Sequence, residues 1–173
     1  MGLEKGLVEL YVGDGKGKTS AAIGLAIRCV GAKLKVCMIQ FLKAKPSSEV
    51  QILEFLGVGV FRCGSKDFVD ENQISELDIS EAKRGFDHAK KMIGSGFYDV
   101  VILDEICGAL EYGMLDEKKV IELIESRPDN IEVVLTGRVA SDELRDIADL
   151  CTEMKCVAHP FESGIAARRG IEY

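Results

Sequence analysis

The sequence lacks the features of a secreted, membrane-bound or nucleic-acid-binding chain. No apolar run approaches the roughly 20 residues that span a bilayer, and the N-terminal segment MGLEKG has no apolar signal-peptide core. The formal charge of −7, with no basic run longer than a pair such as Arg168 and Arg169, disfavours a nucleic-acid partner. We therefore expect a cytoplasmic protein that binds neither membranes nor nucleic acid.

Cysteine and histidine patterns typical of metal centres or nucleophilic catalysis are also missing. The six cysteines include no CxxC pair, which argues against a structural zinc site. Several of them lie within apolar runs of a chain without a secretion signal, so we expect free thiols in the core rather than disulfides. His88 has no partner at triad or metal-ligand spacing, which favours a surface or core position over a catalytic one.

The length of 173 residues and the apolar content of 47% indicate one globular domain over residues 1–173. Apolar runs of strand length alternate with stretches of helical pattern, as in a sheet covered on both faces. The predicted strands cover residues 7–12, 35–42, 58–62, 98–105, 131–136 and 152–159. The predicted helices cover residues 18–32, 46–56, 81–95, 111–125 with a break near Gly113, and 141–150.

The organising motif is the segment Gly13–Ser20, GDGKGKTS, which follows a predicted strand and opens a predicted helix. A glycine-rich turn at a helix start leaves backbone N–H groups free to hold an anion of phosphate size. Lys18 supplies a positive charge for the outer phosphates, and Thr19 supplies a hydroxyl for a magnesium ion. The motif predicts a nucleotide-binding P-loop; the alternative is a glycine-rich turn that binds nothing.

The spacing of this loop differs from the common P-loop by one residue. Val12 occupies the place of the usual first glycine, and Gly13 comes four residues before Gly17. The loop is therefore either one residue short or holds a triphosphate differently from an ordinary ATPase.

A second informative run is Tyr98–Glu105, YDVVILDE, in which four apolar residues precede two acidic ones. Asp104 and Glu105 come at the carboxyl end of this predicted strand, the edge where open α/β sheets bind ligands. In P-loop proteins an acidic residue at that place holds magnesium directly or through water. The alternative is that the pair only begins the following helix.

Two later features have both a functional and a structural interpretation. Arg138 follows the predicted strand 131–136, where its guanidinium could reach a phosphate or form only surface pairs. The segment 63–80 has no clean period, which is typical of a functional lid or a disordered connection. Phe68 and Val69 within it either serve that loop or fold back onto the core.

Taken together, these residues resemble the P-loop family of ATP:corrinoid adenosyltransferases almost from end to end. GDGKGKTS is similar to that family's GNGKGKT turn. The other similar segments are QFLK at Gln40–Lys43, VILDE at Val101–Glu105, TGR at Thr136–Arg138 and GIEY at Gly170–Tyr173. The family transfers the 5′-deoxyadenosyl group of ATP to the cobalt(I) of a corrinoid and releases triphosphate, in adenosylcobalamin biosynthesis or salvage.

The resemblance implies an α/β fold, a P-loop NTPase-like three-layer sandwich with a mainly parallel sheet of about six strands. It also implies a homodimer, ATP as co-substrate, Mg²⁺ or Mn²⁺ as cofactor, and a reduced corrinoid with a flavoprotein reductase as partners. The phosphates would lie on the loop in the reverse sense to ordinary NTPases. The implied ATP-binding residues are Gly13, Asp14, Gly15, Lys16, Gly17, Lys18, Thr19 and Arg28.

The implied metal residues are Thr19, Asp104 and Glu105, while Lys18 and Arg138 position the leaving triphosphate. No general base is expected, because cobalt(I) has no proton to lose. Phe68 is the one implied corrinoid contact, since the chain has no Trp for the second aromatic position that some members have. Asp14 stands where the family commonly has Asn, which adds a negative charge near the nucleotide. The N-terminal segment that longer members fold over the site is expected to be missing.

Two other functions use the same loop. A small-molecule kinase would transfer the γ-phosphate and would need an acid or base beside the acceptor. A nucleotide-switched ATPase would bind a partner protein only in its ATP state. The absence of an NKxD motif makes GTP a less suitable nucleotide than ATP.

Overall fold

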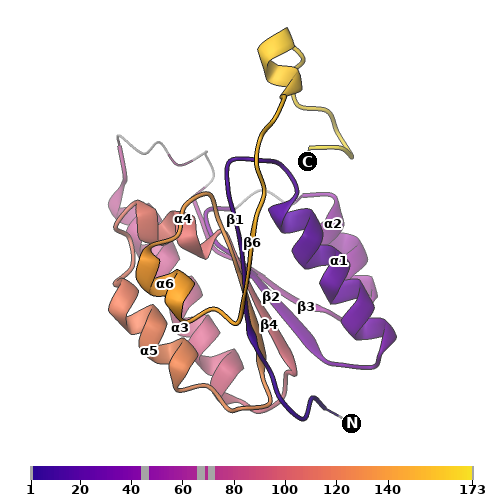
Figure 1. Ribbon diagram of the computed structural model, residues 1–173, viewed down its shortest axis with the longest axis vertical. Helices are drawn as coiled ribbons and strands as arrows, with labels where there is room; N and C mark the ends of the chain where they lie inside the picture. The colour runs from indigo at the N-terminus through magenta and orange to yellow at the C-terminus, as the bar shows by residue number, and fades with distance from the viewer. Residues whose placement is uncertain (1, 44–46, 66–68, 70–72, 173) are drawn as a thin grey trace.

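The chain forms one six-stranded sheet with helices on both faces, as the computed structural model shows (Figure 1). The structure describes residues 2–43, 47–65, 69 and 73–172. All five strand pairings are parallel, in the order β3-β2-β4-β5-β1-β6. This confirms the predicted three-layer α/β fold, with a sheet that is parallel throughout its described strands.

The strands are short, as is usual for parallel sheets. They are β1 Val8–Val12, β2 Val36–Gln40, β3 Gly59–Arg62, β4 Val100–Asp104, β5 Glu132–Thr136 and β6 Leu150–Glu153. The helices are α1 Lys18–Gly31, α2 Glu49–Phe55, α3 Glu76–Gly94, α4 Ile106–Glu111, α5 Glu117–Glu125 and α6 Asp142–Asp146, followed by the 3₁₀ turn Pro160–Ser163.

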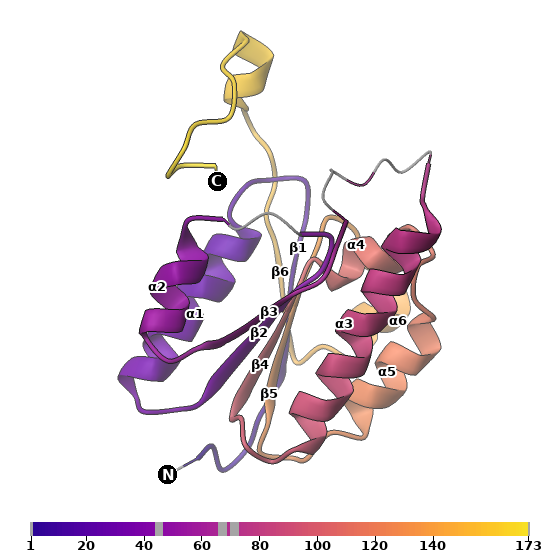
Figure 2. The ribbon, with the colours of Figure 1, turned by 180° about the vertical axis from the view of Figure 1, so that it is seen from behind.

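Helices α1 and α2 cover one face of the sheet, and α3 to α6 cover the other, as the two opposite views show (Figures 1 and 2). Strands β2 and β4 are buried along their whole length, whereas the edge strand β6 is exposed along its whole length. Both faces of the central strands therefore carry apolar side chains, which explains their nearly unbroken apolar sequences.

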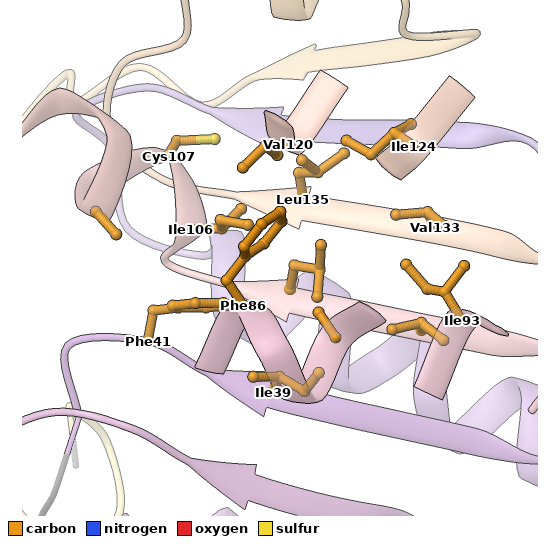
Figure 3. Packing of buried hydrophobic residues seen from close by; sticks show 14 of the residues in the cluster. Ile39, Phe41, Phe86, Ile93, Ile106, Cys107, Val120, Ile124, Val133 and Leu135 are labelled. Carbon is orange, nitrogen blue, oxygen red and sulfur yellow. The ribbon is translucent and has the colours of Figure 1, made fainter. Parts of the chain in front are cut away.

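The larger core lies between the sheet and helices α3, α4 and α5 (Figure 3). Phe86 of α3, Ile124 of α5 and Leu135 of β5 all belong to this cluster of buried side chains. Burying a side chain of this size contributes about 1.5–3 kcal/mol. The smaller core on the α1 side includes Ala22 and Ala26, whose small side chains let the helix lie close to the sheet.

Helix α3 begins at Glu76, five residues before the predicted start at residue 81. A capping box sets this start: the Ser75 hydroxyl accepts from the Asp78 N–H, and the Asp78 carboxylate accepts from the Ser75 N–H. The reciprocal bonds satisfy two N–H groups at the helix start. Because Asp rather than Glu closes the box, the sequence pattern was missed. Val69 packs partly buried against the larger core.

Three other predicted boundaries are wrong. The helix expected over 111–125 begins only at Glu117, as α5, and Glu111 is instead the last residue of α4, a helix that the prediction missed; the predicted break is confirmed where Gly113 takes a positive φ of 66°. Helix α6 ends at Asp146, because the chain must turn back into the sheet: the Asp149 carboxylate accepts from the Val8 N–H at 2.8 Å. Consequently the last strand is β6 at 150–153 instead of 152–159.

The expected core thiols are present. Cys29, Cys37, Cys63 and Cys107 are buried, and all six cysteines are free. Burial raises the pKa of the Cys37 and Cys63 thiols to about 12, so they stay protonated at neutral pH. In the part of the chain that the structure describes, no helix has the length and apolarity needed to cross a bilayer.

Two glycines of α3 give matched tests of the packing. A Cβ on Gly85 would meet the Cys63 sulfur and lie 2.8 Å from Cε1 of Phe41, whereas a Cβ on Gly94 would meet no atom within 4 Å. We expect Gly85→Ala to lower the free energy of unfolding by about 1–3 kcal/mol through overpacking. Gly94→Ala should raise it by about 0.5 kcal/mol or more, because the unfolded chain loses freedom. Urea unfolding measures both; equal shifts in one direction would contradict the packing argument.

Candidate active site

The loop between β1 and α1 holds its shape by close contact with the residues after β6. Gly13 and Gly17 have φ values of 116° and 126°, in the region that favours glycine. A Cβ on Gly15 would lie 2.7 Å from the Met154 carbonyl oxygen, which accepts from the Gly15 N–H at 2.7 Å. Each glycine of the motif is therefore needed for a turn or a close approach.

These contacts engage the first N–H groups of the loop within the protein. Gly13 donates its N–H to the Arg138 carbonyl at 2.9 Å, and Gly15 donates to Met154. The N–H groups that remain available to an anion are therefore those at the start of α1, which have no intrahelical acceptor. No acidic residue lies in the first turn of α1, so nothing there opposes its positive end.

Lys18 is folded into the centre of the loop. Its ammonium donates to the carbonyl oxygens of Gly13 at 2.7 Å and Gly15 at 2.8 Å, and the residue is buried. Both acceptors are uncharged backbone carbonyls, so no carboxylate of the described residues forms an ion pair with the Lys18 ammonium. The arrangement leaves the charge of this ammonium available to an anion.

Asp104 joins the loop to the acidic strand end. Its Oδ1 accepts from the Thr19 hydroxyl at 2.8 Å and from the Thr136 hydroxyl at 2.8 Å. Thr136 in turn accepts from the Glu105 N–H at 2.9 Å. Asp104 is fully buried, and its partners come from α1 and β5, so three segments predicted separately meet at one carboxylate.

The other oxygen of Asp104 binds residues that the motifs alone did not identify as site residues. The Lys43 ammonium lies 2.7 Å from Oδ2, and the Gln40 amide donates to the same oxygen at 3.4 Å. Burial would lower the pKa of Lys43, but the charge and hydrogen bond of Asp104 outweigh it and raise the pKa. Their position could have identified them as site residues, because both lie at the carboxyl end of β2, beside the carboxyl end of β4.

Glu105 occupies the turn between β4 and α4 in a left-handed conformation, with φ at 61°. Burial and then the negative charge of Asp104 raise the pKa of Glu105, and Lys43, Lys18 and Arg138 oppose them in part. Burial and a neighbouring carboxylate make Glu105 costly to ionise. A cation bound nearby would favour its ionised form.

The oxygen donors at this edge fit a magnesium or manganese ion. Asp104, Glu105 and Thr19 supply two carboxylates and a hydroxyl, the donor class preferred by these hard cations. The buried Oε1 of Gln40 accepts no hydrogen bond from the described residues, so it is free to accept from a metal-bound water. Over the described ranges no group of three or more His, Cys, Asp and Glu forms a complete metal cage. Magnesium in nucleotide sites commonly completes its shell with phosphates and water.

Two predicted ATP-binding side chains contact the C-terminal segment. The Asp14 carboxylate accepts from the Cys156 N–H at 3.0 Å, and this bond is the first cause of its lowered pKa. The Lys16 ammonium binds the Ile171 carbonyl oxygen and Oε1 of Glu172, both at 3.0 Å. No local sequence pattern indicates these contacts, because they join residues 142 to 156 positions apart.

The remaining predicted site residues lie in different places. Arg138 is exposed and lies next to the loop through its backbone, because its carbonyl accepts from the Gly13 N–H at 2.9 Å. Arg28 lies in the last turn of α1, about 15 Å along the helix from Lys18, and is not brought to the loop. Phe68 lies outside the described residues.

His88 belongs to another part of the surface. Its ring stacks on Phe61 with centroids 3.9 Å apart, and the Arg84 guanidinium carbon lies 4.5 Å from the centroid of the same Phe61 ring. These residues line an open groove of about 920 Å³ beside α3 and β3. Burial, then the charges of Lys91 and Arg84, lower the pKa of His88. The packing accounts for this histidine without a catalytic role.

Comparison with known proteins gives a consistent family. The family described as "ATP:corrinoid adenosyltransferase BtuR/CobO/CobP" matches residues 4–173. The chain is 35% identical over 171 residues to the corrinoid adenosyltransferase of Escherichia coli K12, covering 98% of this chain and 87% of the relative. It is 36% identical to corrinoid adenosyltransferase CobA of Salmonella typhimurium, with the same coverage. It is 37% identical to the Sinorhizobium corrinoid adenosyltransferase, covering 98% of this chain and 81% of the relative.

Proposed function

Because the chain belongs to the ATP:corrinoid adenosyltransferase family, we propose that it transfers the 5′-deoxyadenosyl group of ATP to the cobalt(I) of a corrinoid and releases triphosphate. The observation that carries this proposal is the 2.8 Å bond between the Thr19 hydroxyl and Asp104. It joins a phosphate loop to an acidic strand end, the pair of features that a triphosphate–metal complex requires.

The reaction forms a cobalt–carbon bond at C5′ and breaks the bond from C5′ to the triphosphate oxygen. The two electrons of the new bond come from cobalt(I), and the electrons of the broken bond leave with the triphosphate. No proton is removed from the nucleophile, so no side-chain base is required. This agrees with a site rich in cations and N–H groups.

The protein's part is to orient ATP and to stabilise charge on the leaving group. Lys18 and the N–H groups at the start of α1 bind the phosphates, together with Arg138, whose backbone carbonyl is bonded to Gly13 of the same loop. Asp104 fixes the Thr19 hydroxyl and the Lys43 ammonium on one side of this loop. Their hydrogen bonds exist before substrate binds, so little reorganisation is needed during the reaction.

A magnesium or manganese ion bound through Thr19, Asp104 and Glu105 would neutralise negative charge on the departing triphosphate. The raised pKa of Glu105 and the open Oε1 of Gln40 support this assignment. Gly13 to Thr19 are the proposed phosphate-binding residues. Arg28 would contact ATP only if another molecule or a rearrangement brought the two together, so we do not include it in the pocket of one chain.

Product analysis tests the proposed function. ATP labelled at the γ-phosphate is mixed with chemically reduced corrinoid without oxygen, and the products are separated by ion exchange. We expect labelled triphosphate in equal amount to a new cobalt–carbon product seen by absorption. ADP and labelled phosphate would instead indicate a hydrolase, and ADP with a labelled acceptor a kinase; either result would overturn the proposal.

We propose three further properties with the same function. A homodimer is supported by the edge strand β6, which is exposed along its length and begins with the exposed apolar residue Leu150. A cytoplasmic location is supported by six free cysteines, which suit a reducing compartment. A flavoprotein reductase is supported by the reaction itself, since an electron donor must supply cobalt(I). We also treat residues 1–173 as a single domain, since one sheet holds all six strands.

A further inference from the structure

The residues after β6 form a strap over the phosphate loop, which we define as residues 154–172. The chain leaves the sheet at β6, extends away from the fold and returns to the start of α1 (Figures 1 and 2). Residues 157–172 are all exposed. The strap is therefore positioned by its two ends and not by burial against the sheet.

Both ends of the strap are held by adjacent residues of the loop. At the near end, Met154 accepts from Gly15 and Cys156 donates to Asp14. At the far end, Ile171 and Glu172 bind the Lys16 ammonium, each at 3.0 Å. A loop that binds phosphate thus also closes a ring of 16 exposed residues, 157–172.

We propose that Glu172 is an autoinhibitory anion, which holds Lys16 in the free protein and gives it up to the triphosphate when ATP binds. This inference rests on the proposed function, because it requires ATP in the loop. Lys16 belongs to the GKGKT part of the motif, and Glu172 presents to it a carboxylate in place of a phosphate oxygen. One ammonium cannot serve both anions fully, so binding of ATP and closure of the far end oppose each other.

When Lys16 passes from Glu172 to the triphosphate, Glu172 keeps another positively charged partner. The Glu172 carboxylate also accepts from Arg168, through its backbone N–H at 2.7 Å and its guanidinium at 3.0 Å. Hydrogen bonds from Arg168, and then from Lys16, lower the pKa of Glu172 to about 2. The carboxylate therefore remains ionised and paired with Arg168 after Lys16 leaves. Release of the far end costs one exposed ion pair and the hydrogen bond from Lys16 to the Ile171 carbonyl.

The experiment compares Glu172→Gln with Glu162→Gln. Both variants remove one negative charge from the strap, but no hydrogen bond or ion pair joins Glu162 to the loop residues that the structure describes. Isothermal titration with magnesium ATP measures the Kd of each variant and of the wild type. Because an exposed ion pair contributes only weakly, we expect Glu172→Gln to bind ATP about two- to five-fold more tightly than Glu162→Gln.

A second measurement reports the movement. Hydrogen–deuterium exchange of the wild type should be faster over residues 165–172 with ATP present, because the far end has been released, and slower over residues 13–20. Equal Kd values for the two variants, or slower exchange over 165–172 with ATP, would overturn the proposal for Glu172. A wild type that binds no ATP would overturn the proposed function as well, so the two failures are distinct.

Discussion

Replacing Lys18 with alanine should lower the kcat/KM for adenosyl transfer by at least about 100-fold while the chain still folds. The ammonium lies at the centre of the loop and binds the Gly13 and Gly15 carbonyls. Its positive charge is fixed before the triphosphate begins to leave, and removing one such preorganised group costs about 10²–10³ in rate. The rate is measured as triphosphate released per enzyme under anaerobic conditions.

Lys118→Ala is the matched control for this variant. Lys118 is exposed on α5, so its loss removes the same charge far from the loop and should leave the rate unchanged. Lys18→Ala also leaves two loop carbonyls without their donor, which costs about 1–3 kcal/mol of stability. Thermal unfolding separates this cost from the kinetic effect. A folded Lys18→Ala protein with wild-type turnover would remove the loop from the mechanism.

Replacing Asp104 with asparagine should lower the free energy of unfolding by about 3 kcal/mol, the lower end of the range for breaking a buried ion pair. Asn keeps an acceptor for Thr19 and Thr136 but leaves the Lys43 ammonium without its counter-charge. The side chain of Lys43 is 30% exposed, so water recovers part of the loss. Urea unfolding without nucleotide measures the change.

Two variants test whether the pairing causes this loss. Asp87→Asn breaks the exposed pair with Lys90 on α3, and we expect less than about 1 kcal/mol. Adding Lys43→Met to Asp104→Asn should recover stability relative to Asp104→Asn alone, since the unpaired charge is removed. If the double variant loses more free energy of unfolding than the two single variants lose in sum, the ion pair does not explain the loss in Asp104→Asn.

The sequence predicted the layers of the fold because its central strands β2 and β4 are almost wholly apolar and because its loop motif stands between a strand and a helix. Strands β2 and β4 are buried on both faces, so their pattern is unambiguous. The ends of the helices were harder to predict than the layers. The start of α3 depends on a hydrogen-bonded exchange between Ser75 and Asp78, and the end of α6 depends on a bond from Val8 to Asp149. Only the second of these is a contact between distant residues.

The same distinction applies to the site. Thr19, Asp104 and Glu105 were predicted as one group because each lies at a known position relative to a strand or helix. Lys43 completes the group from the neighbouring strand β2, and its role follows only once the strand order places β2 beside β4. The contacts of Lys16 with the strap follow from no local pattern, because an exposed segment of the chain carries few positional signals.

Leu42 and Glu105 both have φ values near 60° and follow the ends of the adjacent strands β2 and β4. For side chains larger than glycine this backbone shape costs on the order of 1 kcal/mol or more. In return, each residue redirects the chain at the same edge of the sheet, Leu42 immediately before Lys43 and Glu105 immediately after Asp104. Stability and a precisely oriented active site therefore favour different residues at these two positions. Glycine would relieve the backbone strain, but it would also let Lys43 and the peptide after Asp104 take more orientations.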